Sequence, residues 1–265
     1  MTSTVLVTGG TGTLGRHVVP LLRDAGRPVR VLSRHRHEPT DGVDQVTGDL
    51  DSGAGIEAAL AGIDTVVHCA GSAKGDEGKA RTLVRAASRA GVRHLVNISV
   101  VGAERIPVTG RVDRAMFGYF AAKRGAEQVV ADSGLPWTNL RATQFHDLMA
   151  TVLGQLAKLP VIPVPAGFRF QPVDAGEVAA RLVALALDPP AGQVPDLAGP
   201  RVYGMDELVR GYLRATGRRR RPIVPVPVPG GAARALRAGA NLAPDRAVGR
   251  RSWEDFLAER VRPGR

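Results

Sequence analysis

Val5-Leu6-Val7-Thr8-Gly9-Gly10-Thr11-Gly12-Thr13-Leu14-Gly15 is the stretch of sequence that decides the fold. Residues 5–8 form a short apolar run, glycines follow at positions 9, 12 and 15, and a helical pattern covers residues 14–25. Glycines at this spacing allow a tight turn and let the backbone approach a pyrophosphate at the helix N-terminus. The stretch therefore predicts a strand, a phosphate-binding loop and a helix, with a purely structural glycine turn as the alternative.

Strands and helices continue to alternate through the first half of the chain. Further strands are predicted at residues 28–33, 45–47, 65–69, 94–99 and 137–141, and helices at 56–60, 77–90 and 117–132, the last after a loop over 102–114. The strands are apolar nearly throughout, as strands are when helices cover both faces of a parallel sheet. The predicted fold class is therefore α/β, a doubly wound parallel sheet of the Rossmann type. Pro20 lies inside the first helix and should bend its axis.

The pattern becomes less regular after residue 150. Proline-punctuated strands are predicted at 161–165 and 223–227, with helices at 175–187 and 205–216. We therefore expect a nucleotide-binding core over residues 1–150 and a small C-terminal substrate-binding region over 151–265, with the helix at 175–187 packing back on the core. Open α/β sheets bind ligands beyond the carboxyl ends of their strands, so the substrate is expected near that edge.

Composition and charge narrow the class of protein. The 265 residues carry a formal net charge of +11, 44% hydrophobic residues and a single cysteine, Cys69. No apolar run approaches the roughly 20 residues of a membrane helix, and the N-terminus lacks the pattern of a signal peptide, so a cytoplasmic protein without a membrane span is expected. Binding of an anionic cofactor is enough to explain a net positive charge, so no nucleic-acid partner is expected. The expected partner is a small-molecule substrate, with a homodimer left open.

Two polar segments have weaker functional interpretations. The run Arg218-Arg219-Arg220-Arg221 could contact nucleic acid or lipid headgroups, but it is short and has no interleaved aromatic residues, so a solvated turn is favoured. His35 and His37 share a polar loop without companion cysteines or a carboxylate array, so no metal site is predicted.

The end of the second strand indicates which cofactor is bound. About 20 residues beyond the glycine loop, an NAD-binding fold has an acidic residue against the ribose 2′-hydroxyl. This chain has Ser33 and Arg34 there instead. A hydroxyl and a guanidinium can bind a 2′-phosphate, whereas a carboxylate would repel it, so NADP(H) is the predicted cofactor, with a solvated arginine-rich loop as the alternative. Asp49, after the third strand, is expected near the adenine amino group or as the N-cap of the next helix.

With these motifs the chain resembles the short-chain dehydrogenase/reductase superfamily, and within it the atypical, NmrA-like NAD(P)H-binding branch. The G-x-x-G-x-x-G loop, the turn Gly48-Asp49-Leu50, the segment Ala90-Gly91-Val92-Arg93-His94-Leu95-Val96-Asn97-Ile98-Ser99 and the segment Gln171-Pro172-Val173-Asp174 fall in that family's order. The resemblance covers nearly the whole chain and implies a Rossmann domain with a small C-terminal substrate region. It leaves the reaction open, because the branch includes reductases, isomerase-like members and non-catalytic redox sensors.

Tyr119 and Lys123 match the superfamily's Y-x-x-x-K pattern. Four residues apart on a helix, the phenol and the ammonium share one face, and the lysine charge is expected to lower the tyrosine pKa and make the phenol a usable proton donor. The same spacing also occurs on ordinary amphipathic helices. The third expected member is a hydroxyl after the fifth strand. Ser99 is present, but the family's usual position falls a residue or two later, at Val100 and Val101, so the triad could be incomplete and the protein a slow reductase or a binder.

The predicted site residues gather at the ends of strands. The cofactor-binding set comes from the glycine loop, the ends of the next three strands and the lysine of Y-x-x-x-K: Thr8, Gly9, Gly12, Thr13, Leu14, Gly15, Ser33, Arg34, Asp49, Leu50, Cys69, Ala70, Gly71 and Lys123. The substrate set follows the sixth strand: Gln144, Phe145 and His146.

The resulting hypothesis is an NADP(H)-dependent oxidoreductase that transfers hydride to or from a small carbonyl, enone or quinone-like substrate. Tyr119, Lys123 and Ser99 are its expected catalytic residues. Two alternatives stay open: a non-catalytic NADP(H)-sensing regulator that binds a protein partner, and a nucleotide-sugar epimerase or dehydratase.

Overall fold

The computed structural model describes residues 4–36, 42–71, 75–218 and 221–261, which form two compact units. Unit 1 comprises the residues up to Ser99 together with Gly118–Arg141 and Gly176–Pro195. Unit 2 comprises Val100–Phe117, Ala142–Ala175 and the residues from Asp196 onward. The chain thus returns to each unit twice, whereas the sequence predicts a single passage near residue 150.

Unit 1 is built on a seven-stranded parallel sheet with the strand order β3-β2-β1-β4-β5-β6-β9. Its strands are β1 Thr4–Thr8, β2 Val29–Ser33, β3 Val43–Thr47, β4 Ile63–His68, β5 His94–Val100, β6 Trp137–Ala142 and β9 Gly192–Gln193. Thr8 is paired with Leu32 on one side and with His68 on the other, so the carboxyl ends of these strands lie along one edge.

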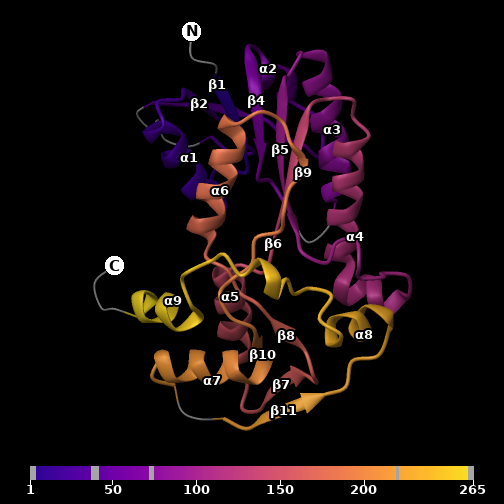
Figure 1. Ribbon diagram of the computed structural model, residues 1–265, viewed down its shortest axis with the longest axis vertical. Helices are drawn as coiled ribbons and strands as arrows, with labels where there is room; N and C mark the ends of the chain where they lie inside the picture. Colours follow the sequence, from indigo (N-terminus) through magenta and orange to yellow (C-terminus); the bar gives the residue numbers. More distant parts are fainter. Residues whose placement is uncertain (1–3, 37–41, 72–74, 219–220, 262–265) are drawn as a thin grey trace. The chain divides into compact units, whose positions relative to one another are not determined.

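Helices cover both faces of this sheet, which confirms the predicted doubly wound fold (Figure 1). They are α1 Gly15–Asp24, α2 Ile56–Leu60, α3 Asp76–Arg89, α4 Arg111–Ala131 and α6 Ala175–Leu187. Figure 1 shows α1 and α6 on one side of the strands and α2 and α3 on the other. On the second side, Ile56, Leu83 and Val130 pack with Leu6 and Leu95 of the sheet in one buried cluster. Pro20 lies inside α1 and is exposed to solvent.

Helix α4 begins at Arg111, inside the segment that the sequence assigns to a loop, so that part of the prediction is wrong. Asp113, in the first turn, is 3% exposed and accepts hydrogen bonds from the amides of Gly110 at 3.5 Å and Ala232 at 3.3 Å. An acidic residue in the first turn favours helix formation. The contact with Ala232 joins residues far apart in the chain, which local sequence patterns cannot reveal.

Unit 2 combines short helices with two small two-stranded sheets. Its elements are α5 His146–Leu156, β7 Ile162–Pro165, β8 Arg169–Phe170, β10 Tyr203–Gly204, α7 Met205–Ala215, β11 Ile223–Val226, α8 Gly231–Arg237, a 3-10 turn at Pro244–Arg246, and α9 Trp253–Arg260. β11 pairs with β7 in parallel and β10 with β8 antiparallel. Leu153, Ile162, Leu208 and Trp253 are among the buried residues of its core. The sequence does not predict α5, α8 or α9, whose apolar patterns are short.

The arginine run is partly described. Arg218 and Arg221 donate hydrogen bonds to the carbonyls of Ala157, at 3.2 Å, and Leu159, where the helix α5 ends. Cations at this position suit the negative end of a helix dipole. Arg219 and Arg220 lie outside the described residues, as does His37. Within the described ranges, none of the helices combines the length and the apolar character that crossing a membrane requires.

Candidate active site

The glycine loop after β1 is shaped by two close backbone approaches. Gly9 has a φ of +68°, and a Cβ placed on it would lie 2.7 Å from both the Cα and the amide nitrogen of Ala70. A Cβ on Gly15, at the start of α1, would overlap the carbonyl oxygen of Gly9. Gly9 needs glycine because an L-residue disfavours its positive φ and the backbone of Ala70 leaves no room for a side chain, whereas Gly15 needs glycine for lack of room alone. They place the loop directly against the end of β4.

Gly12 differs from these two glycines because its open side faces away from the protein. Among the described residues, a Cβ on Gly12 would meet the carbonyl oxygen of Gly9 at 3.3 Å and nothing else within 4 Å. No described side chain caps the N-terminus of α1, which follows directly. Free amides at a helix N-terminus and a glycine with space beside it fit the pyrophosphate of a dinucleotide.

The ends of β2 and β3 bring two predicted cofactor residues close together. Arg34 directly follows β2, and its charge contributes to lowering the pKa of Asp49; the largest cause is the hydrogen bond that the Asp49 carboxylate accepts from the amide of Asp51, at 3.1 Å. The N-cap of α2 is Gly55, with a φ of +75°, so the N-cap alternative for Asp49 is wrong. Asp49 instead closes a turn on its own backbone, and its place near the adenine stays a prediction.

Two of the predicted cofactor residues can offer only backbone groups in this structure. The side chain of Leu14 belongs to the core, with 4% of the residue exposed, and Leu50 is 6% exposed in the cluster beneath α2 and α3. Thr13 is half-buried between the loop and α1. The loop therefore presents amides and small residues to a ligand, and its apolar side chains hold it to the sheet.

A buried polar network underlies the ends of β1 and β4. The Thr8 hydroxyl lies 2.7 Å from Nδ1 of His68, and the same hydroxyl oxygen accepts a hydrogen bond from the Ala70 amide at 3.3 Å. Burial lowers the pKa of His68 to about 4, with the nearby Lys123 charge acting in the same direction. His68 is therefore neutral at physiological pH. Burial also raises the pKa of the neighbouring Cys69 thiol to about 12, so Cys69 is no nucleophile at neutral pH.

Lys123 of α4 lies at the carboxyl end of β5. Its Nζ is 3.1 Å from a carboxylate oxygen of Asp76, 3.4 Å from the carbonyl oxygen of Ile98 and 5.8 Å from the centroid of the Tyr119 ring. A Cβ on Gly71 would lie 2.9 Å from the same Nζ. The structure therefore brings Gly71, Tyr119 and Lys123 together, next to the strand residue that precedes Ser99.

The electrostatics of Tyr119 differ from the sequence prediction of a lowered pKa. Desolvation by the surrounding chain raises the pKa of the Tyr119 phenol; Lys123 acts against this increase and Asp76 adds to it. The residue is 36% exposed, so solvent screens part of the effect. The prediction considered the lysine charge alone and missed both the desolvation and the carboxylate beside the lysine. At neutral pH the phenol keeps its proton.

Ser99 lies in the last part of β5 and is 5% exposed. Its hydroxyl has no hydrogen-bond partner within the described part of the chain. A buried polar atom without a partner is uncommon in proteins and marks a place where a ligand or a water could bind. Whether this hydroxyl reaches a substrate stays a prediction.

The expected substrate residues lie in unit 2. His146 is fully buried, and its ring stacks on Phe256, with the ring centroids 5.1 Å apart, and lies 5.9 Å from the ring of Trp253. Burial lowers the pKa of His146 to about 4, and neither ring nitrogen has a partner among the described residues. Gln144 and Phe145 are half-buried. This environment favours a core role for His146, and its role in substrate binding stays a prediction.

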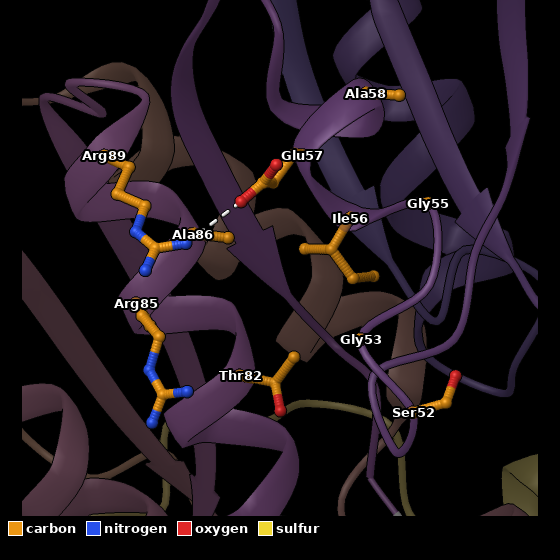
Figure 2. A pocket seen from close by; sticks show the side chains of 10 residues that line it. All are labelled: Ser52, Gly53, Gly55, Ile56, Glu57, Ala58, Thr82, Arg85, Ala86 and Arg89. Atoms are coloured by element: carbon orange, nitrogen blue, oxygen red, sulfur yellow. Dashed lines mark hydrogen bonds and ion pairs between the residues drawn. The ribbon is translucent and has the colours of Figure 1, made fainter.

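A cavity of about 470 Å³ lies elsewhere on unit 1, between α2 and α3 (Figure 2). Figure 2 shows Arg85 and Arg89 on α3 facing this space, with Arg89 paired to Glu57 of α2 at 3.0 Å. A second cavity, of about 540 Å³, lies between α3 and α4. Neither is lined by the glycine loop or by Tyr119 and Lys123.

Sequence reasoning missed His68 and Asp76 as members of this site. Asp76 directly follows Gly75 in the first turn of α3, where an acidic residue is common for its effect on the helix dipole. His68 ends an apolar strand and has the pattern of a core residue. The pairing of Asp76 with Lys123 depends on the approach of α3 to α4, so no signal within either helix could have found it.

Comparisons with known proteins bear on this arrangement. A family model described as NAD(P)H-binding matches residues 9–189. The chain is 38% identical over 144 residues to the (4-alkanoyl-5-oxo-2,5-dihydrofuran-3-yl)methyl phosphate reductase of Streptomyces griseus, a match that covers 53% of this chain and 48% of that protein. It is 28% identical over 221 residues to the NAD(P)H azoreductase of Xenophilus azovorans, covering 81% of this chain and 74% of that protein. The chain thus spans about half the length of the first of these relatives.

Two solved structures have the same fold. The NADPH-dependent quinone oxidoreductase of Escherichia coli, complexed with NADPH, superposes with a TM-score of 0.75 at 20% identity, over 97% of this chain and 98% of that one. The UDP-glucose 4-epimerase of Thermus thermophilus, in complex with NAD, gives a TM-score of 0.72 at 21% identity, over 98% and 99% of the two chains. Identities this low establish the fold alone, and the fold accommodates either cofactor.

Proposed function

The chain belongs to the NAD(P)H-binding family, in the atypical short-chain dehydrogenase/reductase branch that its motifs predict, and from this premise we propose that it is an NADP(H)-dependent oxidoreductase acting on a small carbonyl, enone or quinone-like substrate. One observation carries the proposal. The Lys123 ammonium lies beside the Tyr119 ring and the Ile98 carbonyl. This place is at the carboxyl ends of the strands, where the glycine loop also lies. An acid-base pair next to a dinucleotide cradle supports hydride-transfer chemistry.

The roles of the residues follow from their chemistry. The bound cofactor would supply the hydride that reduces the substrate carbon. Tyr119 would donate its phenolic proton to the substrate oxygen, and the Ser99 hydroxyl would donate a hydrogen bond to the same oxygen as negative charge develops there. The Lys123 ammonium would then stabilise the phenolate that remains. Because the pKa of Tyr119 is raised, the phenol holds its proton at neutral pH, which suits the direction of reduction.

The preference for NADP(H) over NAD(H) is part of the proposal. Ser33 and Arg34 would bind the 2′-phosphate, and no acidic residue occupies the position where an NAD-specific fold carries one. The Arg34 charge contributes to lowering the pKa of Asp49, so the Asp49 carboxylate would help to orient the guanidinium. Removing Arg34 should weaken NADPH binding by roughly tenfold or more, because a charge-assisted hydrogen bond is lost, and leave NADH binding unchanged. Arg85→Ala, on α3, is the control and should bind both cofactors as the wild type does.

The activity test follows the loss of NADPH absorbance with a panel of ketones, enones and quinones. Tyr119→Phe should reduce turnover on the order of a hundredfold or more while leaving NADPH affinity intact. Tyr212→Phe, a change of the same chemistry in unit 2, should keep wild-type turnover. Tight NADPH binding with no oxidation of NADPH by any of these substrates would favour the non-catalytic sensor instead. Interconversion of nucleotide sugars without net NADPH consumption would favour an epimerase.

A cytoplasmic location belongs to the same proposal, and a homodimer stays one of the two assembly states to be tested. Cys69 is the chain's single cysteine, so an internal disulfide is excluded, as suits a reducing compartment. Size-exclusion chromatography with light scattering would decide between a monomer and a dimer.

A further inference from the structure

Asp76 and Lys123 form a buried ion pair that the proposed chemistry does not itself require. The Nζ to carboxylate distance is 3.1 Å, and the two side chains are 1% and 9% exposed. Removing water from two charges is costly, so such a pair persists where its geometry is good and further hydrogen bonds complete it. The Ile98 carbonyl, at 3.4 Å from Nζ, provides one of these.

The end of β4 leaves space for this pair. A Cβ on Gly71 would lie 2.9 Å from Nζ of Lys123 and 3.3 Å from the Asp76 carboxylate oxygen. A larger residue would have to displace one of the two charged groups. The small residue therefore allows the ammonium and the carboxylate to meet directly over the strand end.

The described charged and titratable groups around the pair come from β4, α3, α4 and the turn after β3. His68 of β4 is neutral at physiological pH, because burial holds its pKa near 4. On α3, Lys79 pairs with Asp51 at 3.2 Å. On α4, Tyr119 experiences opposite effects from Lys123 and Asp76 on its pKa, downward from the ammonium and upward from the carboxylate. Among the described residues, Asp76 is the charge that opposes the effect of Lys123 on the pKa of Tyr119.

We propose that Asp76 is a positioning residue of this site: its carboxylate fixes the Lys123 ammonium at the carboxyl ends of β4 and β5 and balances its charge beside Tyr119. The inference deepens the proposed function and rests on it for its catalytic consequence. Lysine suits this place because its ammonium is a compact point charge, whereas a guanidinium would need a wider, planar site. The chain uses 32 arginines and four lysines, so a lysine here departs from its general preference.

Loss of the carboxylate has two separate consequences. The Lys123 charge would act on Tyr119 without opposition, so the phenol pKa should fall. The ammonium would also lose its shortest contact and could leave the place from which it stabilises a phenolate. A residue that only held α3 against α4, without acting on the ammonium or the phenol, would produce neither effect.

The first experiment needs no substrate. Phenolate absorbance is titrated against pH in the wild type and in Asp76→Asn, and the same titrations in the Tyr119→Phe background are subtracted, which isolates Tyr119 from the other two tyrosines. The Tyr119 midpoint should move to lower pH in Asp76→Asn. Asp64→Asn is the matched control, because Asp64 pairs with Arg93 at 2.8 Å at the opposite end of β4. Equal midpoints in Asp76→Asn and the control would overturn the proposal.

The second experiment is a double-mutant cycle on turnover. Asp76→Asn should lower kcat by about tenfold to a hundredfold with little change in KM for NADPH, and should have no further effect once Lys123 is replaced by glutamine. Additive losses would show that Asp76 acts independently of Lys123 and would refute positioning. If Asp76→Asn alone does not fold, Asp76→Glu, which keeps the charge but lengthens the side chain, supplies the titration and the turnover in its place, and a wild-type midpoint together with a wild-type kcat would refute positioning. A wild type that oxidises no NADPH would defeat the proposed function, whereas the tyrosine titration would still decide the role of Asp76.

Discussion

Replacing single glycines of the loop by alanine should separate folding from cofactor binding. At Gly9 a side chain meets a φ of +68° and a backbone contact of 2.7 Å with Ala70. The left-handed region costs about 1–2 kcal/mol for a residue with a Cβ, and overpacking adds about 1–3 kcal/mol, so Gly9→Ala should lower the free energy of unfolding by about 2–5 kcal/mol. At Gly12 the φ is not positive and the nearest atom is 3.3 Å away, so Gly12→Ala should change the free energy of unfolding by less than about 1 kcal/mol.

The affinity for NADPH should be affected more by Gly12→Ala than by Gly9→Ala. A methyl group on Gly12 would occupy the space that a pyrophosphate needs, so Gly12→Ala should raise the Kd for NADPH at least about tenfold, which corresponds to about 1.4 kcal/mol. Urea denaturation followed by tryptophan fluorescence gives the unfolding energies, and titration with NADPH gives the Kd. Wild-type affinity in folded Gly12→Ala would refute the placement of the pyrophosphate, and equal stability of the two variants would refute the loop geometry.

Two further predictions test side-chain packing, one in unit 2 and one in unit 1. Burial lowers the pKa of His146 from 6.5 to about 4, so the unfolded chain takes up this proton first as the pH falls, and about 3 kcal/mol of stability is lost between pH 6.5 and pH 4. His146→Phe should reduce the slope of stability against pH in that range, measured by urea denaturation, by one proton, while His68, whose pKa is also near 4, keeps its own contribution; an unchanged slope would contradict a buried neutral ring. Glu127 accepts hydrogen bonds of 2.8 and 2.7 Å from Arg141, with the side chains 12% and 16% exposed, so Glu127→Gln should cost about 3 kcal/mol of unfolding free energy. The exposed pair of Glu57 and Arg89 is its control, since Glu57→Gln should change stability by about 0.5 kcal/mol or less, and equal losses would contradict the effect of burial.

Much of unit 1 could be predicted because its signals are local. Glycines at 9, 12 and 15 place a turn between β1 and α1, and the helices predicted at 56–60 and 175–187 have the bounds that the structure gives. The apolar strands indicate burial on both faces, and β5 is buried along its whole length. These features depend on residues close together in the sequence, where side-chain period and turn chemistry carry the information.

Unit 2 could be predicted less well because its short elements depend on distant partners. His146 is the first residue of α5. Its buried ring stacks on Phe256 of α9, which lies more than a hundred residues later in the chain. Gln171 donates a hydrogen bond to the carbonyl of Gly199 at 2.8 Å and accepts one from the amide of Ala243 at 3.0 Å. Such contacts cannot be inferred from spacing within one segment.

The sequence by itself determined the glycine loop, the parallel sheet and the face shared by Tyr119 and Lys123, because each follows from the geometry of one turn, one strand or one helix. The tertiary structure alone decided the charge state of that face. The helix α3 brings the Asp76 carboxylate to the Lys123 ammonium, and the surrounding chain desolvates the phenol, so the pKa of Tyr119 rises where the lysine alone would lower it. A pKa depends on all the charges and all the water around a group, and those are fixed only when the helices have packed.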